Sequence, residues 1–354
     1  MNAFYSDVIQ FAGSHYDFGF MQGEKLKTSP ILKNRKRQWA SSRKRHFKID
    51  EQEALKLFER FMPRMRDEIK GLADALGWTM TEAVREFGGY YVEEERSGCS
   101  ILTGDNYIVR NYDSDPAFYE GRFMIYEPTD GGYATIGPSM QITGRTDGMN
   151  EKGLVMGYNF INRVGSEDGF VCNMIGRMIL ENSATIEEAI DLLKAIPHRT
   201  AFNYVVSDLS GDSYVVEASP RKVIARKASV STNHFHVLLE ENRYRTDESI
   251  RRERILLNKS EEDLDVLSAY ELLNNDKFDV YSEKYDAAAG TIHTAVYLPK
   301  EQRVLFTLGK NRMPVIFNFG RHLAGETNRI KQIKGLLDYE KPFVNMENSQ
   351  KVDL

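Results

Sequence analysis

The sequence is poor in cysteine. Cys99 and Cys172 are the two cysteines among its 354 residues. They could form one disulfide in principle, but a chain of this length can bury a stable core without a cross-link. No Cys-x-x-Cys pair is present, which excludes the common cysteine-rich zinc sites. We therefore expect two reduced thiols and a cytoplasmic protein.

Long hydrophobic runs and a strong positive charge are missing as well. No apolar run approaches the roughly 20 residues that a membrane span requires. The first residues, Met-Asn-Ala-Phe-Tyr-Ser-Asp, contain no basic stretch followed by an apolar core. The sequence therefore predicts neither a secretory signal nor a membrane partner. The formal net charge of -5 argues against a general nucleic-acid binder.

One segment departs from this acidic balance. The residues from Lys33 to Lys48 form a run rich in lysine and arginine. Such a run could bind nucleic acid or an anionic surface, or it could be a solvated helix face or an exposed loop. The acidic balance of the remaining chain favours the second interpretation.

The seven histidines are scattered, with one exception. His234 and His236 lie two residues apart on an expected strand, so their side chains share a face. A metal site would need further ligands, and the sequence identifies none. We therefore predict no metal and no cofactor.

The order of expected elements indicates an α+β protein. A strand over 7–13 precedes a helix that starts at His15, and helices follow from residue 51 to Phe87. Gly77 suits a helix C-cap, and Thr79 or Thr81 suits the start of the next helix. From Cys99 onward, strands predominate around two central helices in 172–196. Repeated hairpins predict two largely antiparallel sheets with helices outside.

Two further local patterns bear on the architecture. Gly19 and Gly23 lie four apart on the first helix, where they share a face and allow close approach of another backbone. The segment from Asp147 to Gly153 is rich in glycine and asparagine and predicts a turn.

A hairpin opens at Cys99. Two β-rich runs flank Gly104-Asp105-Asn106, a turn whose residues tolerate left-handed backbone angles. The hairpin folds Cys99 back toward Arg110 and Asp113, with Asn111 opposite Cys99 if the turn has three residues. A thiol beside a cation and a carboxylate is a catalytic arrangement. Positions 110 and 113 face opposite sides of an ideal strand, so both reach one site only if the strand bends or bulges.

Several motifs together resemble a known family. They are Tyr16–Gly23, Gly98-Cys99-Ser100, Arg110–Asp113, Asp147–Leu154 with Asn159 downstream, Asn203–Asp208 with Glu217, and Thr232–Phe235. In this order they resemble the acyl-coenzyme A:6-aminopenicillanic acid acyltransferase family, or peptidase C45. Its members are N-terminal-nucleophile (Ntn) hydrolases, related to choloylglycine hydrolases and penicillin V acylases. The resemblance covers roughly residues 10–310.

The resemblance implies a four-layer αββα fold and autocatalytic cleavage between Gly98 and Cys99. Residues 1–98 would be a helical leader, serving as propeptide or α-chain, and 99–354 the catalytic β-chain. The leader would pack on the β-chain as part of one compact domain. Because choloylglycine hydrolases carry their cysteine near the start of the precursor, the long leader favours the acyltransferase branch.

Cys99 has a chemical logic of its own. A thiol is weakly ionised at neutral pH and needs a base nearby. If Cys99 becomes a chain terminus, its α-amine has a reference pKa of about 7.7–8.0, which suits a general base. The competing interpretation is a buried structural cysteine, which we prefer for Cys172.

The resemblance also implies roles for further residues. Asp113 would orient the α-amine and Arg110 would stabilise the thiolate, with a surface ion pair as the alternative for each. Asn159 and Asn233 are candidates for holding the oxyanion of acyl transfer, or else cap strand ends. Among three nearby arginines we choose Arg251, whose spacing to Arg254 resembles the paired arginines of the relatives; a solvated helix face is the alternative.

The predicted function is a cysteine hydrolase or acyltransferase acting on linear, non-peptide C–N amides. Its partner would be a small amide or acyl substrate, for which an acyl-coenzyme A donor is one candidate. A homo-oligomer is left open. Phe118, Tyr119, Phe160 and Phe170 could line an acyl pocket or belong to the core. The alternatives are a non-processing Ntn-like scaffold that binds a small acyl ligand, and an interaction module that uses the basic run. The sequence identifies neither the acyl group nor the acceptor.

Overall fold

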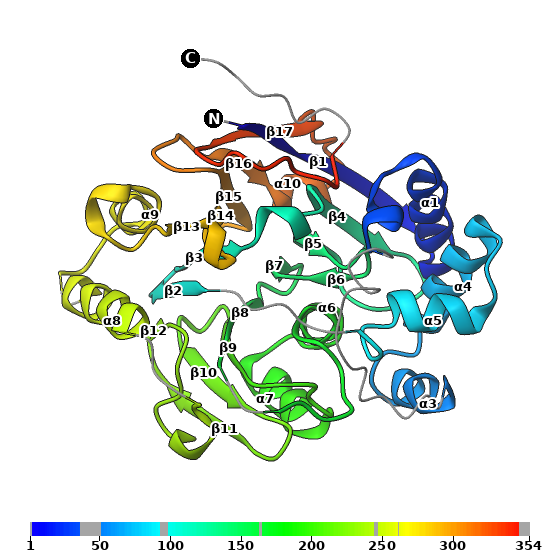
Figure 1. Cartoon of the computed structure of the whole chain (residues 1–354), viewed down its shortest axis with the longest axis horizontal. Coiled ribbons are helices and arrows are strands. Elements are labelled where there is room, and N and C mark those ends of the chain that lie inside the picture. Colours follow the sequence, from blue (N-terminus) through cyan, green and yellow to red (C-terminus); the bar gives the residue numbers. More distant parts are fainter. Residues whose placement is uncertain are drawn as a thin grey trace.

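Two β-sheets lie at the centre of the molecule, and helices cover both outer sides (Figure 1). The computed structural model describes residues 2–35, 51–92, 98–162, 165–243, 247–260 and 262–346. Of the basic run from Lys33 to Lys48, residues 36–48 lie outside the described residues. Within the described residues, no helix has the length and apolar character to cross a membrane.

The large sheet has ten strands within the described residues, and the small sheet has seven. In spatial order the large sheet contains β11 (Val223–Lys227), β10 (Ser213–Ala218), β9 (Phe202–Ser207), β8 (Val155–Phe160), β7 (Asp147–Asn150), β5 (Thr135–Met140), β4 (Arg122–Pro128), β1 (Asn2–Gly13) and β17 (Gln332–Leu337), with β6 (Gly144–Arg145) beside β5. The small sheet contains β12 (Val230–Ser231), β2 (Cys99–Gly104), β3 (Tyr107–Ser114), β14 (Ala289–Leu298), β15 (Arg303–Leu308) and β16 (Val315–Asn318), with β13 (Glu283–Lys284) beside β14.

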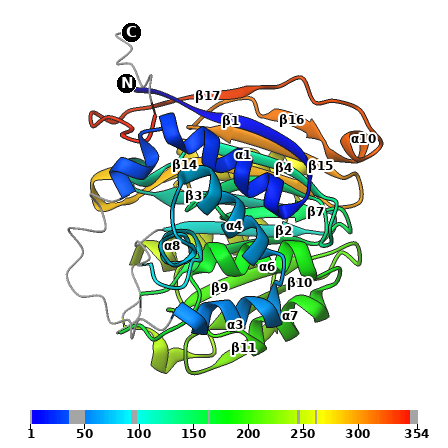
Figure 2. The same ribbon diagram turned by 90° about the vertical axis from the view of Figure 1, so that its right-hand side faces the viewer.

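Helices form the two outer layers. Figure 1 shows α8 (Asp247–Ser260) and α9 (Val266–Asn274) on one side, and α1 (His15–Thr28), α4 (Met65–Leu76) and α5 (Met80–Phe87) on the opposite side. In Figure 2, which looks onto that opposite side, α3 (Glu51–Phe61), α6 (Cys172–Asn182) and α7 (Ile186–Ala195) lie with α1 and α4 in front of the sheets. The short α10 (Phe319–Leu323) follows β16.

The three largest apolar clusters of the described residues lie between these layers. The first joins the outer helices to the large sheet, as in the contact region of Phe58, Met174 and Tyr204. The second lies between the sheets and includes Cys99 and Phe306. The third joins the small sheet to α8 and α9. The predicted αββα arrangement of largely antiparallel sheets is thereby confirmed.

Local sequence signals explain several boundaries. Gly77 ends α4 in the left-handed region, with φ of 68°, where a side chain would be strained. Thr79 then starts α5 with a capping box, in which its side chain and that of Glu82 satisfy each other's backbone N–H groups. Both predictions are confirmed.

The glycines of α1 allow a close helix contact, as predicted. A Cβ on Gly19 would lie 1.9 Å from the carbonyl oxygen of Glu68 on α4. On α4 itself, a Cβ on Gly71 would lie 2.1 Å from the carbonyl oxygen of Tyr16. The two backbones touch here, which leaves no room for a methyl group on either side.

The described part of residues 1–98 is not only helical. Its first strand, β1, is longer than the predicted 7–13 and lies inside the large sheet, parallel to β4 and antiparallel to β17. Residues 1–98 therefore contribute an inner strand, next to the edge strand β17, to a sheet whose other strands come from residues 99–354.

Two turn predictions were wrong. Asp147–Asn150 forms strand β7, and the turn begins only at Glu151. The β2–β3 hairpin turns on Asp105 and Asn106 alone, because Gly104 pairs with Tyr107. Tyr112, rather than Asn111, therefore lies opposite Cys99.

Candidate active site

Cys99 is the first residue of β2, and its side chain is fully buried between the two sheets. Alternate residues of a strand share a face. The pairing of Cys99 with Tyr112 and of Ile101 with Arg110 therefore places all four side chains on the face toward the large sheet. Neither Cys99 nor Cys172 forms a disulfide.

The Arg110 guanidinium lies against the sulfur of Cys99. Its Nη2 donates to Sγ at 3.5 Å and to the backbone oxygen of Tyr158 at 2.7 Å. Its Nη1 forms an ion pair with the buried carboxylate of Asp147. A cation in this position stabilises a thiolate, which agrees with the role expected for Arg110.

Asp147 is the counter-ion that the sequence analysis missed. Its carboxylate also accepts a hydrogen bond from Tyr297 at 2.7 Å and lies 3.2 Å from Nε2 of His293. Burial alone would raise the pKa of Asp147, but Arg110 and His293 hold it well below its usual range. The charge on Arg110 is thus compensated and its guanidinium is held in place.

The surroundings of Cys99 favour its neutral thiol. Burial raises its pKa to about 11, although Arg110 acts in the opposite direction. Nucleophilic attack by Cys99 therefore needs a base.

Asp113 approaches the same strand end from the opposite face. Its carboxylate accepts hydrogen bonds from Nη1 of Arg252 at 2.7 Å and from Oγ1 of Thr291 at 2.6 Å. Burial raises its pKa to about 6, while Arg252 and Thr291 act to lower it. Arg110 and Asp113 do face opposite sides, as an ideal strand requires.

No bend in β3 is needed to bring both residues to Cys99. The irregularity lies instead on β14, where Thr291 pairs with Asp113 and His293 with Tyr112, leaving Ile292 as an extra residue. Arg110 reaches the Cys99 sulfur, whereas Asn233, which follows the neighbouring strand β12, reaches the Cys99 nitrogen.

Both sides of the Gly98–Cys99 peptide bond are held by hydrogen bonds. The backbone N–H of Asp113 donates to the carbonyl oxygen of Gly98 at 3.0 Å. The backbone N–H of Cys99 donates to Oδ1 of Asn233 at 3.0 Å. A Cβ on Gly98 would lie 3.1 Å from Oδ2 of Asp113 and 3.3 Å from Nη2 of Arg252, which is tighter than most real Cβ contacts.

Asn233 holds the Cys99 nitrogen through its side-chain oxygen. Its Oδ1 also accepts from Nη2 of Arg252 at 3.0 Å, and its Nδ2 donates to the backbone oxygen of Phe160 at 2.9 Å. Asn159, the other oxyanion candidate, lies on β8. Its buried Nδ2 donates to Ser231 at 3.0 Å, and an amide nitrogen has a second N–H to offer.

The structure places Arg251 outside this site. Arg251 is exposed and donates to the backbone oxygen of Asp279, whereas its neighbour Arg252 is buried between Asp113 and Asn233. A helical period would have identified Arg252, because it shares the buried face of α8 with Ser249 and Leu256. Thr291 carried no comparable signal in the sequence.

The other residues considered in the sequence, which include Tyr119, Phe170 and Cys172, lie in different parts of the core. Tyr119 packs in the cluster between the sheets, and Phe170 and Cys172 belong to the cluster under the outer helices. Phe160 is partly buried and contacts Asn233 through its backbone oxygen. Tyr119 and Phe170 thus belong to different apolar clusters.

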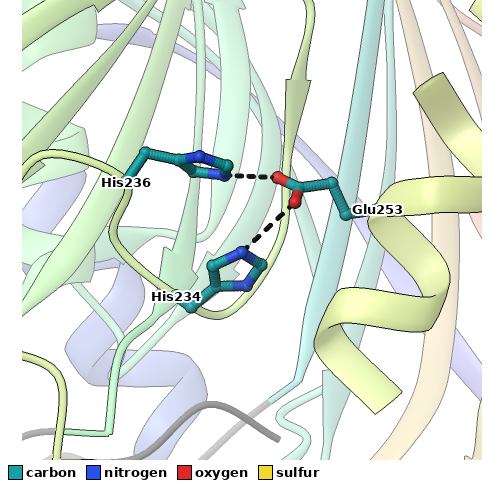
Figure 3. Close-up of side chains that lie close together, drawn as sticks. All are labelled: His234, His236 and Glu253. Atoms are coloured by element: carbon teal, nitrogen blue, oxygen red, sulfur yellow. Dashed lines mark hydrogen bonds and ion pairs between the residues drawn. The ribbon is translucent and has the colours of Figure 1, made fainter. Parts of the chain in front are cut away.

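One group in the described part of the chain has side chains arranged for a metal ion. His234 and His236 meet Glu253, and these residues follow Asn233 and Arg252 closely in sequence (Figure 3).

Comparisons with solved structures find weak likenesses. Penicillin V acylase from Agrobacterium tumefaciens is 19% identical, with a TM-score of 0.41 over 62% of this chain and 84% of that chain. A conjugated bile acid hydrolase variant from Clostridium perfringens is 17% identical, with a TM-score of 0.48 over 69% and 98%. The Caenorhabditis elegans N-acylethanolamine-hydrolyzing acid amidase ortholog is 15% identical, with a TM-score of 0.38 over 57% and 92%.

A family model identifies the family of the chain, although a search of curated proteins does not. No curated protein is detectably similar to the chain. The family model described as acyl-coenzyme A:6-aminopenicillanic acid acyl-transferase matches residues 102–313, which is more than half of the chain. The match includes Arg110, Asp113, Asn159, Asn233 and Arg252. The chain therefore belongs to the acyl-coenzyme A:6-aminopenicillanic acid acyl-transferase family.

Proposed function

We propose that the chain cleaves its own Gly98–Cys99 bond and that Cys99 then acts as the N-terminal nucleophile of an amide hydrolase or acyltransferase. The substrates would be linear, non-peptide C–N amides. The observation that carries this proposal is that hydrogen bonds fix both sides of this peptide bond. The Asp113 N–H donates to the Gly98 oxygen, and the Cys99 N–H donates to Oδ1 of Asn233. Membership of the family supports it.

The cleavage step is an N-to-S acyl shift followed by hydrolysis. Sγ of Cys99 attacks the carbonyl carbon of Gly98 while the Asp113 N–H stabilises the developing oxyanion. The C–N bond breaks, and the thiol proton passes to the departing nitrogen. Water then hydrolyses the thioester, which leaves a carboxylate on Gly98 and a free thiol and amine on Cys99.

Cleavage supplies the base that the uncleaved chain lacks. The new α-amine has a reference pKa of about 7.7–8.0 and takes the thiol proton as the sulfur attacks an amide carbonyl. Arg110 stabilises the thiolate, and Asn159 donates to the tetrahedral oxyanion. The α-ammonium returns the proton to the leaving amine, and the acyl-enzyme thioester passes to water or to another amine.

Asp113, Arg252 and Asn233 hold the amine in this scheme. The Asn233 oxygen accepts an N–H from the Cys99 nitrogen, and Arg252 bridges Asn233 to Asp113.

Trapping of the acyl-enzyme tests the catalytic role. The purified protein is mixed with N-acyl p-nitroanilides of graded acyl length, quenched in acid and digested. We expect the acyl mass on the peptide that begins at Cys99, and unchanged labelling in Cys172→Ala, which removes the other thiol. Acylation elsewhere, or turnover that survives Cys99→Ala, would contradict the proposal.

The full burial of Cys99 favours one alternative, a non-processing scaffold that binds a small acyl ligand. That scaffold would bind N-acyl amides without forming an acyl-enzyme and would keep the Gly98–Cys99 bond intact.

A further inference from the structure

We propose that His234, His236 and Glu253 bind one divalent transition-metal ion of the zinc type. Nε2 of His234 lies 3.2 Å from Oε2 of Glu253, and Nε2 of His236 lies 2.7 Å from Oε1 (Figure 3). One ligand atom from each residue lies within 4.8 Å of the others. An ion about 2.0–2.2 Å from each atom would fit after a small rotation of His236, which is 41% exposed.

The donor set suits such an ion. Two imidazoles and one carboxylate form a common zinc site with an open position for water, and they also accept Co²⁺. His234 is buried and Glu253 nearly so, whereas His236 faces solvent. An ion could therefore enter from the His236 side.

The ligands are held by surrounding groups, as metal ligands usually are. Nδ1 of His234 lies 2.9 Å from Oγ of Ser249, one turn before Glu253 on α8. The carboxylate of Glu217 accepts three backbone N–H groups, those of His236, Val237 and Leu238, at 2.8–2.9 Å. The turn that carries His236 is thereby fixed without any ion.

The site would act as a clamp beside the candidate active site. His234 follows Asn233, and Glu253 follows Arg252, so an ion would join the two segments that hold Cys99 and Asp113. Ser249 already links them, because its Oγ accepts the backbone N–H of Asn233 at 2.8 Å. The ion would stabilise this arrangement rather than touch the reacting atoms.

The competing arrangement is a metal-free ion pair of protonated histidine with Glu253. Titration with Co²⁺, followed by visible absorption and by competition with Zn²⁺, separates the two. The experiment uses a Cys99→Ala background, because a free N-terminal cysteine could itself bind the ion. The result is then independent of whether the chain processes itself.

We expect one ion per chain after desalting, Co²⁺ absorption bands, and a rise in Tm of about 3–4 °C at 100 times Kd. Glu253→Gln and His236→Ala should each weaken binding at least tenfold. His322→Ala is the matched control, since His322 pairs with Glu127 at a separate place and should leave binding unchanged.

Binding that is absent in the background protein, or equal in the ligand variants and the control, would overturn the proposal. Ser249→Ala provides a second check, because loss of a group that orients a ligand weakens metal binding roughly 10–100-fold. Circular dichroism establishes that each variant is folded.

Discussion

Arg252 and Arg251 are adjacent arginines with opposite surroundings, and replacing each by methionine tests the geometry of the site. Arg252→Met removes the partner of the fully buried Asp113 and a hydrogen bond to Asn233. Arg251→Met removes an exposed side chain that contacts the Asp279 backbone. The two changes have the same chemistry on the same helix.

The expected magnitudes differ widely. Breaking a buried ion pair by removing one partner costs about 3–5 kcal/mol, because an uncompensated charge is left behind. Protonation of Asp113, whose pKa is already raised to about 6, limits this cost near neutral pH. Loss of an exposed pair costs about 0–1 kcal/mol. We therefore expect a difference of at least about 2 kcal/mol between the variants.

Urea unfolding in the Cys99→Ala background measures this difference without interference from cleavage. A double variant, Arg252→Met with Asp113→Asn, should recover part of the lost stability, because no buried charge is then left unpaired. In chains that keep Cys99, gel electrophoresis should show slowed processing for Arg252→Met and normal processing for Arg251→Met. Equal effects of the two methionine variants, or a larger effect at position 251, would refute this reasoning.

Three further predictions follow from the same geometry. Gly98→Val should slow processing at least tenfold, because a side chain would press on Asp113 and Arg252; normal cleavage kinetics would argue against the tight fit. Burial raises the pKa of Asp113 from 3.8 to about 6, so the folded chain keeps a proton that the unfolded chain loses. As the pH rises from about 4 to 6, the free energy of unfolding of the Cys99→Ala protein should therefore fall by up to roughly 3 kcal/mol because of this group. Urea unfolding at each pH measures the fall, and Asp113→Asn should remove it. A slope that is the same in both proteins would exclude a raised pKa. Finally, residues 1–98 should co-elute with 99–354 in gel filtration after cleavage, because β1 pairs with β4 and β17; separation without denaturant would contradict this.

Local signals predicted much of the fold. Helix caps and tight hairpins are determined by residues that are close together in the sequence. The Gly77 and Thr79 caps and the β2–β3 hairpin could therefore be predicted. The position of β1 inside the large sheet was not predictable, because its neighbours lie more than 100 residues away. Sheet order depends on such distant pairings.

The same difference between local and distant contacts decides which site residues were predicted. Cys99, Arg110 and Asp113 were found because a single hairpin brings them together. Asp147 was missed because the glycine and asparagine around it predicted a turn, whereas the segment forms a buried strand. No local pattern links Asp147 to its partner Arg110. Glu253 was missed as a partner of the two histidines because α8 approaches them only in the folded chain.

The intact mass of the purified protein tests the central claim most directly. The account predicts that the 40.6 kDa chain is replaced by two chains, residues 1–98 and 99–354, and that N-terminal sequencing of the larger one reads Cys-Ser-Ile-Leu. Cys99→Ala should remain one intact chain. A single intact chain in the unmodified protein, with activity that Cys99→Ala leaves unchanged, would contradict the account.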